Sequence, residues 1–189
     1  MTAETTPQDA ANRYPAVQRA LHWSVAALVF GALALGMAMG WNGFSGLVER
    51  YGRETTNLIY QYHKTFGVMI LALMLVRLAV RRRLGTPPYA EPLTDFEANA
   101  SAFVQRAFYG CLIAMPILGW LGTGAGGFPV EFFAWRLPGI LPKNEGLSEA
   151  LFLLHEIVGW ALVALIVLHV GGALKHAVVN MDRVMERMF

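Results

Sequence analysis

Four long stretches of apolar residues, separated by shorter polar stretches, dominate the pattern of this chain. A helix of about 20 residues crosses the hydrocarbon core of a bilayer, and each stretch reaches that length. Helices are expected because a segment in lipid must satisfy its own backbone hydrogen bonds. The pattern therefore predicts an all-α integral membrane protein, a four-helix bundle with spans at residues 18–41, 58–80, 103–124 and 151–175.

The polar segments divide the chain into three parts. Residues 1–17 form a polar N-terminal segment, residues 18–180 the four-helix transmembrane domain, and residues 181–189 a short tail. The N-terminal segment lacks the short apolar core of a signal peptide, so the first apolar run is expected to remain as an anchor. The joint at residues 125–150 is rich in glycine and proline, and its aromatic residues, including Trp135, suit the membrane interface.

Lysine and arginine are unequally divided between the two ends of the predicted bundle. An even number of spans puts the N-terminus, the second joint and the C-terminus on one side. With the adjoining helix ends, that side carries ten basic residues: Arg13, Arg19, Arg77, Arg81, Arg82, Arg83, Arg106, Lys175, Arg183 and Arg187. The other side carries five: Arg50, Arg53, Lys64, Arg136 and Lys143. The positive-inside rule therefore predicts that both termini are cytoplasmic, in a multi-pass protein of the cell inner membrane.

Composition narrows the function classes. Hydrophobic residues make up 56% of the chain and charged residues 15%, against about 25% charged in soluble domains, so lipid is the expected surrounding. The net charge of +2 is too small and too scattered to indicate nucleic-acid binding. The single cysteine, Cys111, allows no internal disulfide, and the chain has no C-x-x-C-H motif for covalent c-type haem.

Four of the five histidines lie inside the apolar runs, where ionisable side chains are costly and usually functional. His22 lies early in the first span and His169 late in the fourth, so both are expected at the cytoplasmic depth. His63 and His155 lie early in spans that begin on the opposite side, so they share the other depth. The fifth, His176, is predicted at the headgroup level. The four intramembrane histidines thus form two depth-matched pairs.

The spacing of the two histidines on the fourth span strengthens this reading. From His155 to His169 is 14 residues, which is nearly four full helical turns, so both side chains point to one face about 21 Å apart. Two neutral imidazoles can clamp a haem iron from opposite sides. We therefore predict two non-covalent b-type haems, each completed by a neighbouring helix. The alternatives are a proton relay and a zinc or copper site, which would need clustered carboxylates or thiols.

A glycine follows two of these histidines at the same interval. Gly67 lies four residues after His63, and Gly159 lies four residues after His155. A glycine one turn along the same face would let a flat macrocycle approach the helix. Close helix packing is the ordinary alternative, because small residues line contacts between membrane helices.

Several short motifs together resemble the bacterial cytochrome b561 family, over about residues 13–180. They are R-A-L-H-W at 19–23, Y-H-K-T-F-G at 62–67, M-L-V-R-L at 74–78, G-T-P-P at 85–88, L-H-E-I-V-G at 154–159 and L-H-V at 168–170. The resemblance implies that four helices hold two b haems. It implies that His22 and His169 ligate the cytoplasmic haem, and that His63 and His155 ligate the periplasmic one.

The resemblance also implies a function in electron transfer. We expect a dihaem cytochrome that relays electrons between a periplasmic donor or partner protein and quinone, with no catalytic side chain of its own, since the redox chemistry belongs to the cofactors. One type of family member resembles a superoxide oxidase, which reduces ubiquinone with electrons from superoxide. That enzyme is the first alternative, and a haem-free transporter with a histidine proton relay is the second.

Two further predictions concern the cytoplasmic end. His176, Lys175 and Trp23 are candidate neighbours of a quinone, although a helix end that contacts lipid headgroups explains the first two equally well. Arg77 lies 14 residues after His63, so it should face the bundle at the depth of His169. We expect Arg77 to hold an anionic edge of the cytoplasmic haem, against the alternative that it extends to lipid headgroups.

Overall fold

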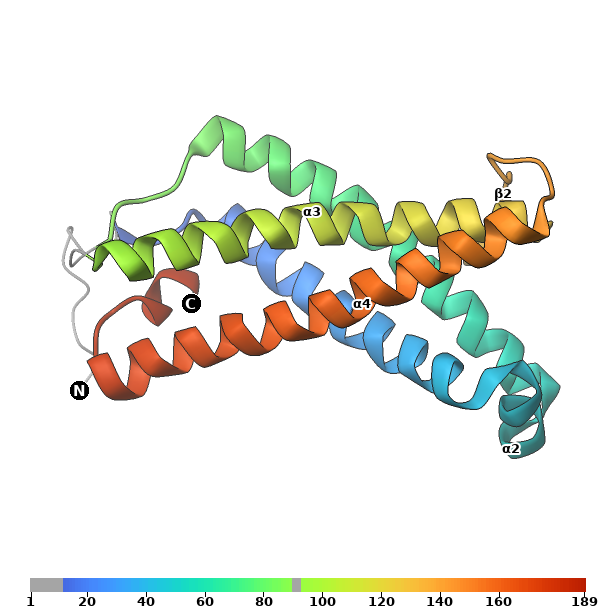
Figure 1. Ribbon diagram of the computed structural model, residues 1–189. Helices are drawn as coiled ribbons and strands as arrows, with labels where there is room; N and C mark the ends of the chain where they lie inside the picture. Colours follow the sequence, from blue (N-terminus) through green and yellow to red (C-terminus); the bar gives the residue numbers. More distant parts are fainter. Residues whose placement is uncertain (1–11, 90–92) are drawn as a thin grey trace.

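The computed structural model describes residues 12–89 and 93–189 (Figure 1). Within them, three helices are long and apolar enough to cross a membrane. They are α2 (Ala16–Leu84), α3 (Asp95–Ala125) and α4 (Glu145–Leu174). The all-α, multi-span prediction is confirmed at this level, and the first two predicted spans both lie within α2.

Helix α2 is 69 residues long and turns back on itself at two glycines (Figure 1). Gly43 (φ 64°, ψ 175°) and Gly52 (φ 80°, ψ 161°) leave the helical region of backbone space. They separate two long legs, residues 16–42 and 53–84, from a short helical stretch at 44–51. The joint predicted at residues 42–57 is therefore mostly helical, and only the two glycines provide the reversal.

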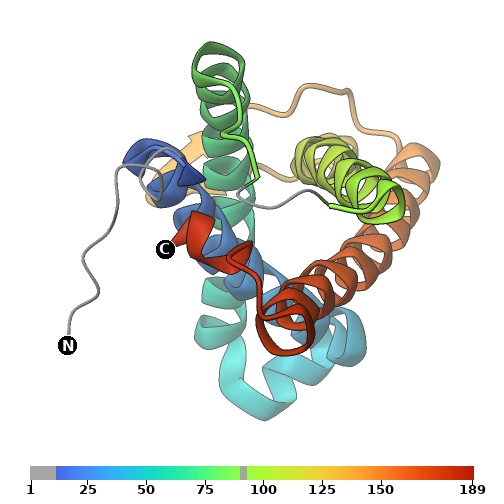
Figure 2. The ribbon, with the colours of Figure 1, turned by 90° about the vertical axis from the view of Figure 1, so that its left-hand side faces the viewer.

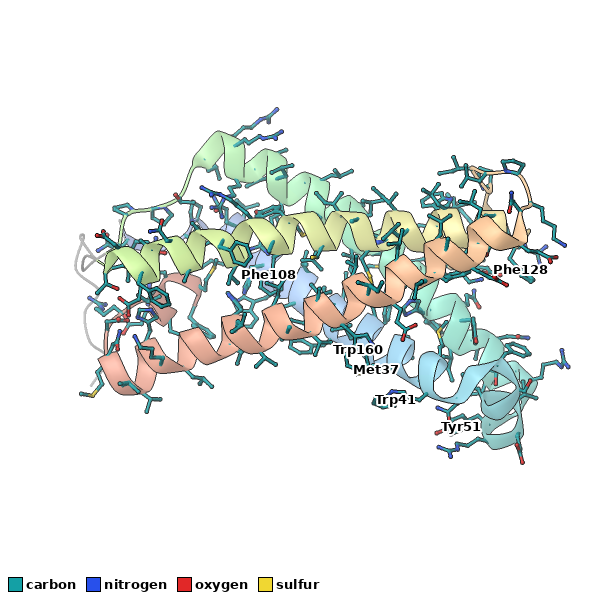
Figure 3. All side chains as sticks on the ribbon, in the orientation of Figure 1. Met37, Trp41, Tyr51, Phe108, Phe128 and Trp160 are labelled. Atoms are coloured by element: carbon teal, nitrogen blue, oxygen red, sulfur yellow. The ribbon has the colours of Figure 1, made fainter. Side chains whose placement is uncertain are left out.

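The two legs of α2 pack with α3 and α4 around one core, as the view along the bundle shows (Figure 2). The buried cluster takes side chains from every leg: Val25, Val29, Ile70, Met74, Leu112 and Leu162. Exposed aromatic residues lie where α2 turns back, with Trp41 and Tyr51 labelled there in Figure 3. Such residues are typical of the membrane–water interface.

Specific polar contacts fix the ends of α3 and α4. At the start of α3, Thr94 and Glu97 form a reciprocal capping box. The Asn144 side chain caps α4, which begins six residues before the predicted span at Glu145. The hydroxyl of Ser148 then donates to the Gly122 carbonyl across 2.9 Å, joining the start of α4 to the end of α3.

A small β-hairpin, which the sequence did not predict, connects α3 to α4. Strands β1 (Val130–Phe132) and β2 (Trp135–Leu137) pair antiparallel. The hairpin is fastened to α2 directly after His63: the Phe133 amide donates to the Thr65 hydroxyl across 3.1 Å, and Lys64 pairs with Glu131. The joint is therefore an ordered cover over this end of the bundle.

The C-terminal segment folds back against the start of α2. It contains a π-helical turn, η1 (Lys175–Asn180), and a 3₁₀ turn, η2 (Met185–Met188). The Tyr14 amide donates to the Arg187 carbonyl across 3.0 Å, and Arg187 is only 6% exposed, over the ring of Tyr89. Both described ends thus lie at the same end of the bundle. Which side of the membrane that end faces stays a prediction.

We expect the two reversal glycines to resist substitution. Their backbone region is essentially restricted to glycine, so Gly43→Ala or Gly52→Ala should lower the free energy of unfolding by about 1–3 kcal/mol. Gly46→Ala is the matched control, because Gly46 lies between them with ordinary helical backbone and would make only an ordinary contact with Asn42. Denaturant unfolding in detergent measures all three. Equal stabilities of Gly43→Ala and Gly46→Ala would contradict this role.

Candidate functional site

Two pairs of histidine rings lie inside the bundle, each formed between α2 and α4. The rings of His63 and His155 have centroids 6.0 Å apart, with an interplanar angle of 73°. The rings of His22 and His169 have centroids 6.1 Å apart, with an angle of 64°. The structure thus brings together the same residues that the depth argument pairs. We call His63 and His155 the outer pair and His22 and His169 the inner pair.

In the outer pair, each ring has one nitrogen engaged by a backbone carbonyl. Nδ1 of His63 lies 2.9 Å from the Ala32 oxygen, and Nδ1 of His155 lies 2.9 Å from the Met115 oxygen. A carbonyl oxygen can only accept a hydrogen bond, so each Nδ1 carries the proton and donates. In a neutral ring this leaves Nε2 with a free electron pair, which is how metal-ligating histidines are commonly held.

The inner pair has a different environment. Nδ1 of His22 is buried and has no hydrogen-bond partner among the residues that the structure describes. An aromatic ring lies beside each histidine: the ring centroid of Trp23 is 5.1 Å from that of His22, and the ring centroid of Phe108 of α3 (Figure 3) is 5.4 Å from that of His169. Arg77 is close enough to interact electrostatically with both histidines. Each histidine of the inner pair therefore has an aromatic neighbour, and the pair lies near a positive charge.

The spacing of both pairs fits a single metal ion held between two imidazoles. A metal–imidazole nitrogen bond is about 2.0 Å and the ring centroid lies about 1.1 Å beyond the nitrogen, so two opposed rings should have centroids about 6 Å apart. The observed 6.0 Å and 6.1 Å agree with this arrangement.

The donor set favours haem over a free metal ion. Over residues 12–89 and 93–189 there is no group of three or more His, Cys, Asp and Glu side chains that could hold a metal. Two imidazoles alone are too few for a zinc or copper site. They suffice for haem b, whose macrocycle supplies the other four iron ligands. That these four histidines ligate haem stays a prediction.

Arg77 is placed on the bundle side of α2, as its spacing from His63 predicted. Its guanidinium carbon lies 5.8 Å from the centre of the Tyr109 ring on α3, and Arg81 contacts the same ring at 5.7 Å. Together with its electrostatic interaction with the inner pair, this contact shows that the side chain is directed toward α3 and the bundle.

The three candidate quinone neighbours have separate surroundings. Trp23 lies against His22, and its indole donates to the Met188 carbonyl across 2.9 Å. Lys175 pairs with Glu97 across 2.6 Å, and His176 hydrogen-bonds Asp182 across 2.6 Å. Only Trp23 directly contacts the inner pair, and the other two are held at the C-terminal segment.

Asp182 is a well-stabilised carboxylate outside the membrane spans. Its partial burial raises the pKa of the carboxyl group. Hydrogen bonds from His176 and the Val184 amide lower the pKa by more than burial raises it, so the net pKa lies below the ordinary value. The contact that Asp182 makes with His176 is therefore present above the usual aspartate range and lost as the pH falls through the lowered pKa.

The glycines near the histidines differ from those that the sequence singled out. Cβ atoms added at Gly67 and Gly159 would meet Pro116 and Met115 of α3, so these two glycines serve the helix packing that was the ordinary alternative. The glycines that face the outer pair are on the first leg of α2 and on α3, as described below, and no short motif links them to the histidines.

Comparisons with known proteins identify one family for this chain. The sequence model of the family described as "Prokaryotic cytochrome b561" matches residues 13–189. The chain is 29% identical over 192 residues to "Cytochrome b561 homolog 2" of Escherichia coli K12, covering 100% of this chain and 95% of that protein. It is 25% identical over 178 residues to "Probable superoxide oxidase CybB" of Yersinia pestis, covering 93% and 95%.

We expect double histidine variants to reveal which residues share a haem. Replacing His63 and His155 together with alanine should leave one haem per chain, because both residues serve one iron. Replacing His22 and His63 together should leave none, because each pair then lacks a ligand. A pyridine haemochrome assay against protein concentration gives the count, and His176→Ala is the control that keeps both haems. Complete haem loss in the His63/His155 variant would show that the pairing is wrong.

Proposed function

The chain belongs to the prokaryotic cytochrome b561 family, and on that premise we propose that it is a dihaem cytochrome relaying electrons between a periplasmic donor and the quinone pool. As a member of this family, the protein is a b-type cytochrome of the membrane that takes part in electron transfer. Family membership thereby removes the haem-free transporter as an alternative. The haem count, the donor and the quinone belong to the proposal. The observation that carries it is the presence of two histidine pairs, each spaced for one iron.

The two pairs occupy opposite depths of the bundle. His155 and His169 lie on the same continuous helix, so their levels differ by about 21 Å, which is most of a hydrocarbon core of about 30 Å. Haem b, when bound, supplies one-electron redox chemistry. His63 and His155 would hold one haem near one membrane face, and His22 and His169 would hold the other near the opposite face. Two one-electron sites at these depths can carry an electron across most of the membrane.

The side chains between the two levels would keep water away from the electron route. Along each histidine-bearing leg, core residues lie between the two depths in sequence: Val25, Val29, Ile70, Met74 and Leu162. All are apolar and nearly fully buried. A dry layer of this kind excludes protons and ions, so only electrons would pass between the two ends.

The charge distribution supports the orientation. Ten of the fifteen basic residues belong to the end of the bundle that carries Tyr14 and the C-terminal segment, or to the sequence beside it, which favours a cytoplasmic inner pair and a periplasmic outer pair. The periplasmic end would then receive electrons from a donor. At the cytoplasmic end, Trp23 would contact a quinone from lipid. His176 and Asp182 would provide a protonatable pair near the water that supplies the protons for quinone reduction.

Superoxide is a second candidate donor, because one of the relatives is named as a probable superoxide oxidase. Capture of an anion is faster when the receiving surface is positive. At the end of the bundle near the outer pair, however, Lys64 pairs with Glu131, and Lys143 with Glu145. These pairs reduce the positive field, so we place a general one-electron donor ahead of superoxide.

Quinone reactivity and the donor can be tested separately. The protein, reduced with one equivalent of electrons per haem, should be reoxidised by a ubiquinone analogue. His176→Ala should keep both haems and slow that reoxidation, because a proton donor is lost. Wild-type protein that quinone cannot reoxidise would refute the relay, and unchanged kinetics in His176→Ala would remove His176 from the quinone site.

A superoxide-generating system gives the second measurement. If superoxide is the donor, quinone reduction should depend on the cytochrome and be abolished by superoxide dismutase. Under the general relay that we favour, the chemically reduced protein still transfers electrons to quinone, but superoxide does not drive the reaction.

Arg77→Leu is expected to lower the redox potential of the inner haem and leave the outer one nearly unchanged. At an effective dielectric constant of about 20, a unit charge on the order of 10 Å away contributes about 1.7 kcal/mol, or about 70 mV for a one-electron couple. The missing positive charge would favour the oxidised iron. Potentiometric titration measures both haems, with exposed Arg82→Leu as the control. Unchanged potentials with normal haem content would make Arg77 a lipid anchor.

A further inference from the structure

Two glycines face the rings of the outer pair: Gly36, on the first leg of α2, faces His63 of the second leg, and Gly119, on α3, faces His155 of α4. A Cβ added at Gly36 would lie 2.9 Å from Cε1 of His63, closer than real Cβ atoms approach other atoms. A Cβ added at Gly119 would lie 3.1 Å from Cε1 and 3.3 Å from Nδ1 of His155. Each ring therefore rests on a helix surface from which the side chain is missing.

The same glycine positions give each ring its hydrogen bond. His63 donates to the carbonyl of Ala32, four residues before Gly36. His155 donates to the carbonyl of Met115, four residues before Gly119. In an α-helix that carbonyl already accepts the amide of the residue four positions later, which here is the glycine itself. A histidine can share the carbonyl only when it approaches over that residue, where a Cβ would stand in its way.

This arrangement occurs twice, on two different helices, once for each histidine of the outer pair. Gly36 and Ala32 belong to the first leg of α2, whereas Gly119 and Met115 belong to α3. Gly67 and Gly159, which follow the same two histidines along the chain, face α3 side chains instead. Ordinary helix packing explains a glycine next to any neighbour, but it does not explain why both rings use the carbonyl one turn before the glycine.

We propose that Gly36 and Gly119 are positioning residues for the outer haem, acting through His63 and His155. Each glycine opens the helix surface so that Nδ1 reaches the shared carbonyl, and we call each of these two glycine surfaces a cradle. The hydrogen bond then fixes the proton on Nδ1 and leaves Nε2 free to bind iron. The inference rests on the proposed function, because it requires that the outer pair holds a haem.

The surroundings of the two histidine pairs would bias the potentials of the two haems in opposite directions. Donation from Nδ1 makes the ligating nitrogen a stronger electron donor, and a stronger donor stabilises oxidised iron. At the inner pair, Nδ1 of His22 has no partner within the described residues, and Arg77 adds a positive charge that stabilises reduced iron. The outer haem would therefore have the lower potential, and electrons would move from the outer pair to the inner pair.

Gly36→Ala and Gly119→Ala test the cradles by potentiometric titration and by the low-spin ferric signal in electron paramagnetic resonance. Both variants should raise the potential of the outer haem and shift its ferric signal, with the inner haem unchanged. Gly36→Ala should have the larger effect, because its Cβ overlap is greater. Gly40→Ala and Gly110→Ala are matched controls on the same two helices, where an added Cβ would meet nothing within 4 Å.

The possible results separate this inference from the proposed function. Selective loss of the outer haem in Gly36→Ala would support the cradle, and the milder Gly119→Ala would then supply the potential shift. Potentials and signals equal to those of the control variants would overturn the inference, and so would equal shifts of both haems. Wild-type protein with fewer than two haems would instead refute the proposed function.

Discussion

Each imidazole inside this bundle has two ring nitrogens, and both need partners in a place where water cannot supply them. The rest of the structure depends on this requirement. In the outer pair, Nδ1 of each ring donates to a backbone carbonyl, one on the first leg of α2 and one on α3. These hydrogen bonds require both helices to lie within contact distance of the histidines. The remaining nitrogen of each ring, Nε2, is left free, and the two ring centroids lie 6.0 Å apart, which is the spacing expected for one iron held between them. The same helix contacts therefore hold the bundle together and orient its proposed ligands.

Much of this arrangement could be predicted from the sequence, because straight helices convert residue numbers into depth and direction. The interval from His155 to His169 placed two side chains on one face at two levels. The position of His22 and His63 within their spans then identified the partner of each. The same conversion placed Arg77 on the bundle side of α2 near the inner pair. These predictions need only helical geometry and an alternating order of spans.

Other features depend on contacts that no local pattern encodes. The hairpin turns at Phe133, which takes a left-handed backbone without the Asn-Gly or Asp-Gly signal of such turns. Gly36 and Gly119 meet their histidines only because particular helices cross at particular points, whereas the glycines beside His63 and His155 in the sequence turned out to face elsewhere. Glycine is frequent in membrane helices for several reasons, so its contact partner follows from packing and not from its presence.

The two ends of the bundle are closed in the same way, by segments attached next to a proposed ligand. Lys64 and Thr65, which follow His63, hold the hairpin through Glu131 and the Phe133 amide. Trp23, which follows His22, holds the C-terminal segment through the Met188 carbonyl and the Phe189 ring. A cover anchored at the neighbouring residue cannot move away without disturbing the backbone of the histidine. Exclusion of water and orientation of the ring are therefore coupled at both levels. This coupling explains why hydrogen-bonding residues directly follow His22 and His63, two histidines that must themselves remain in an apolar interior.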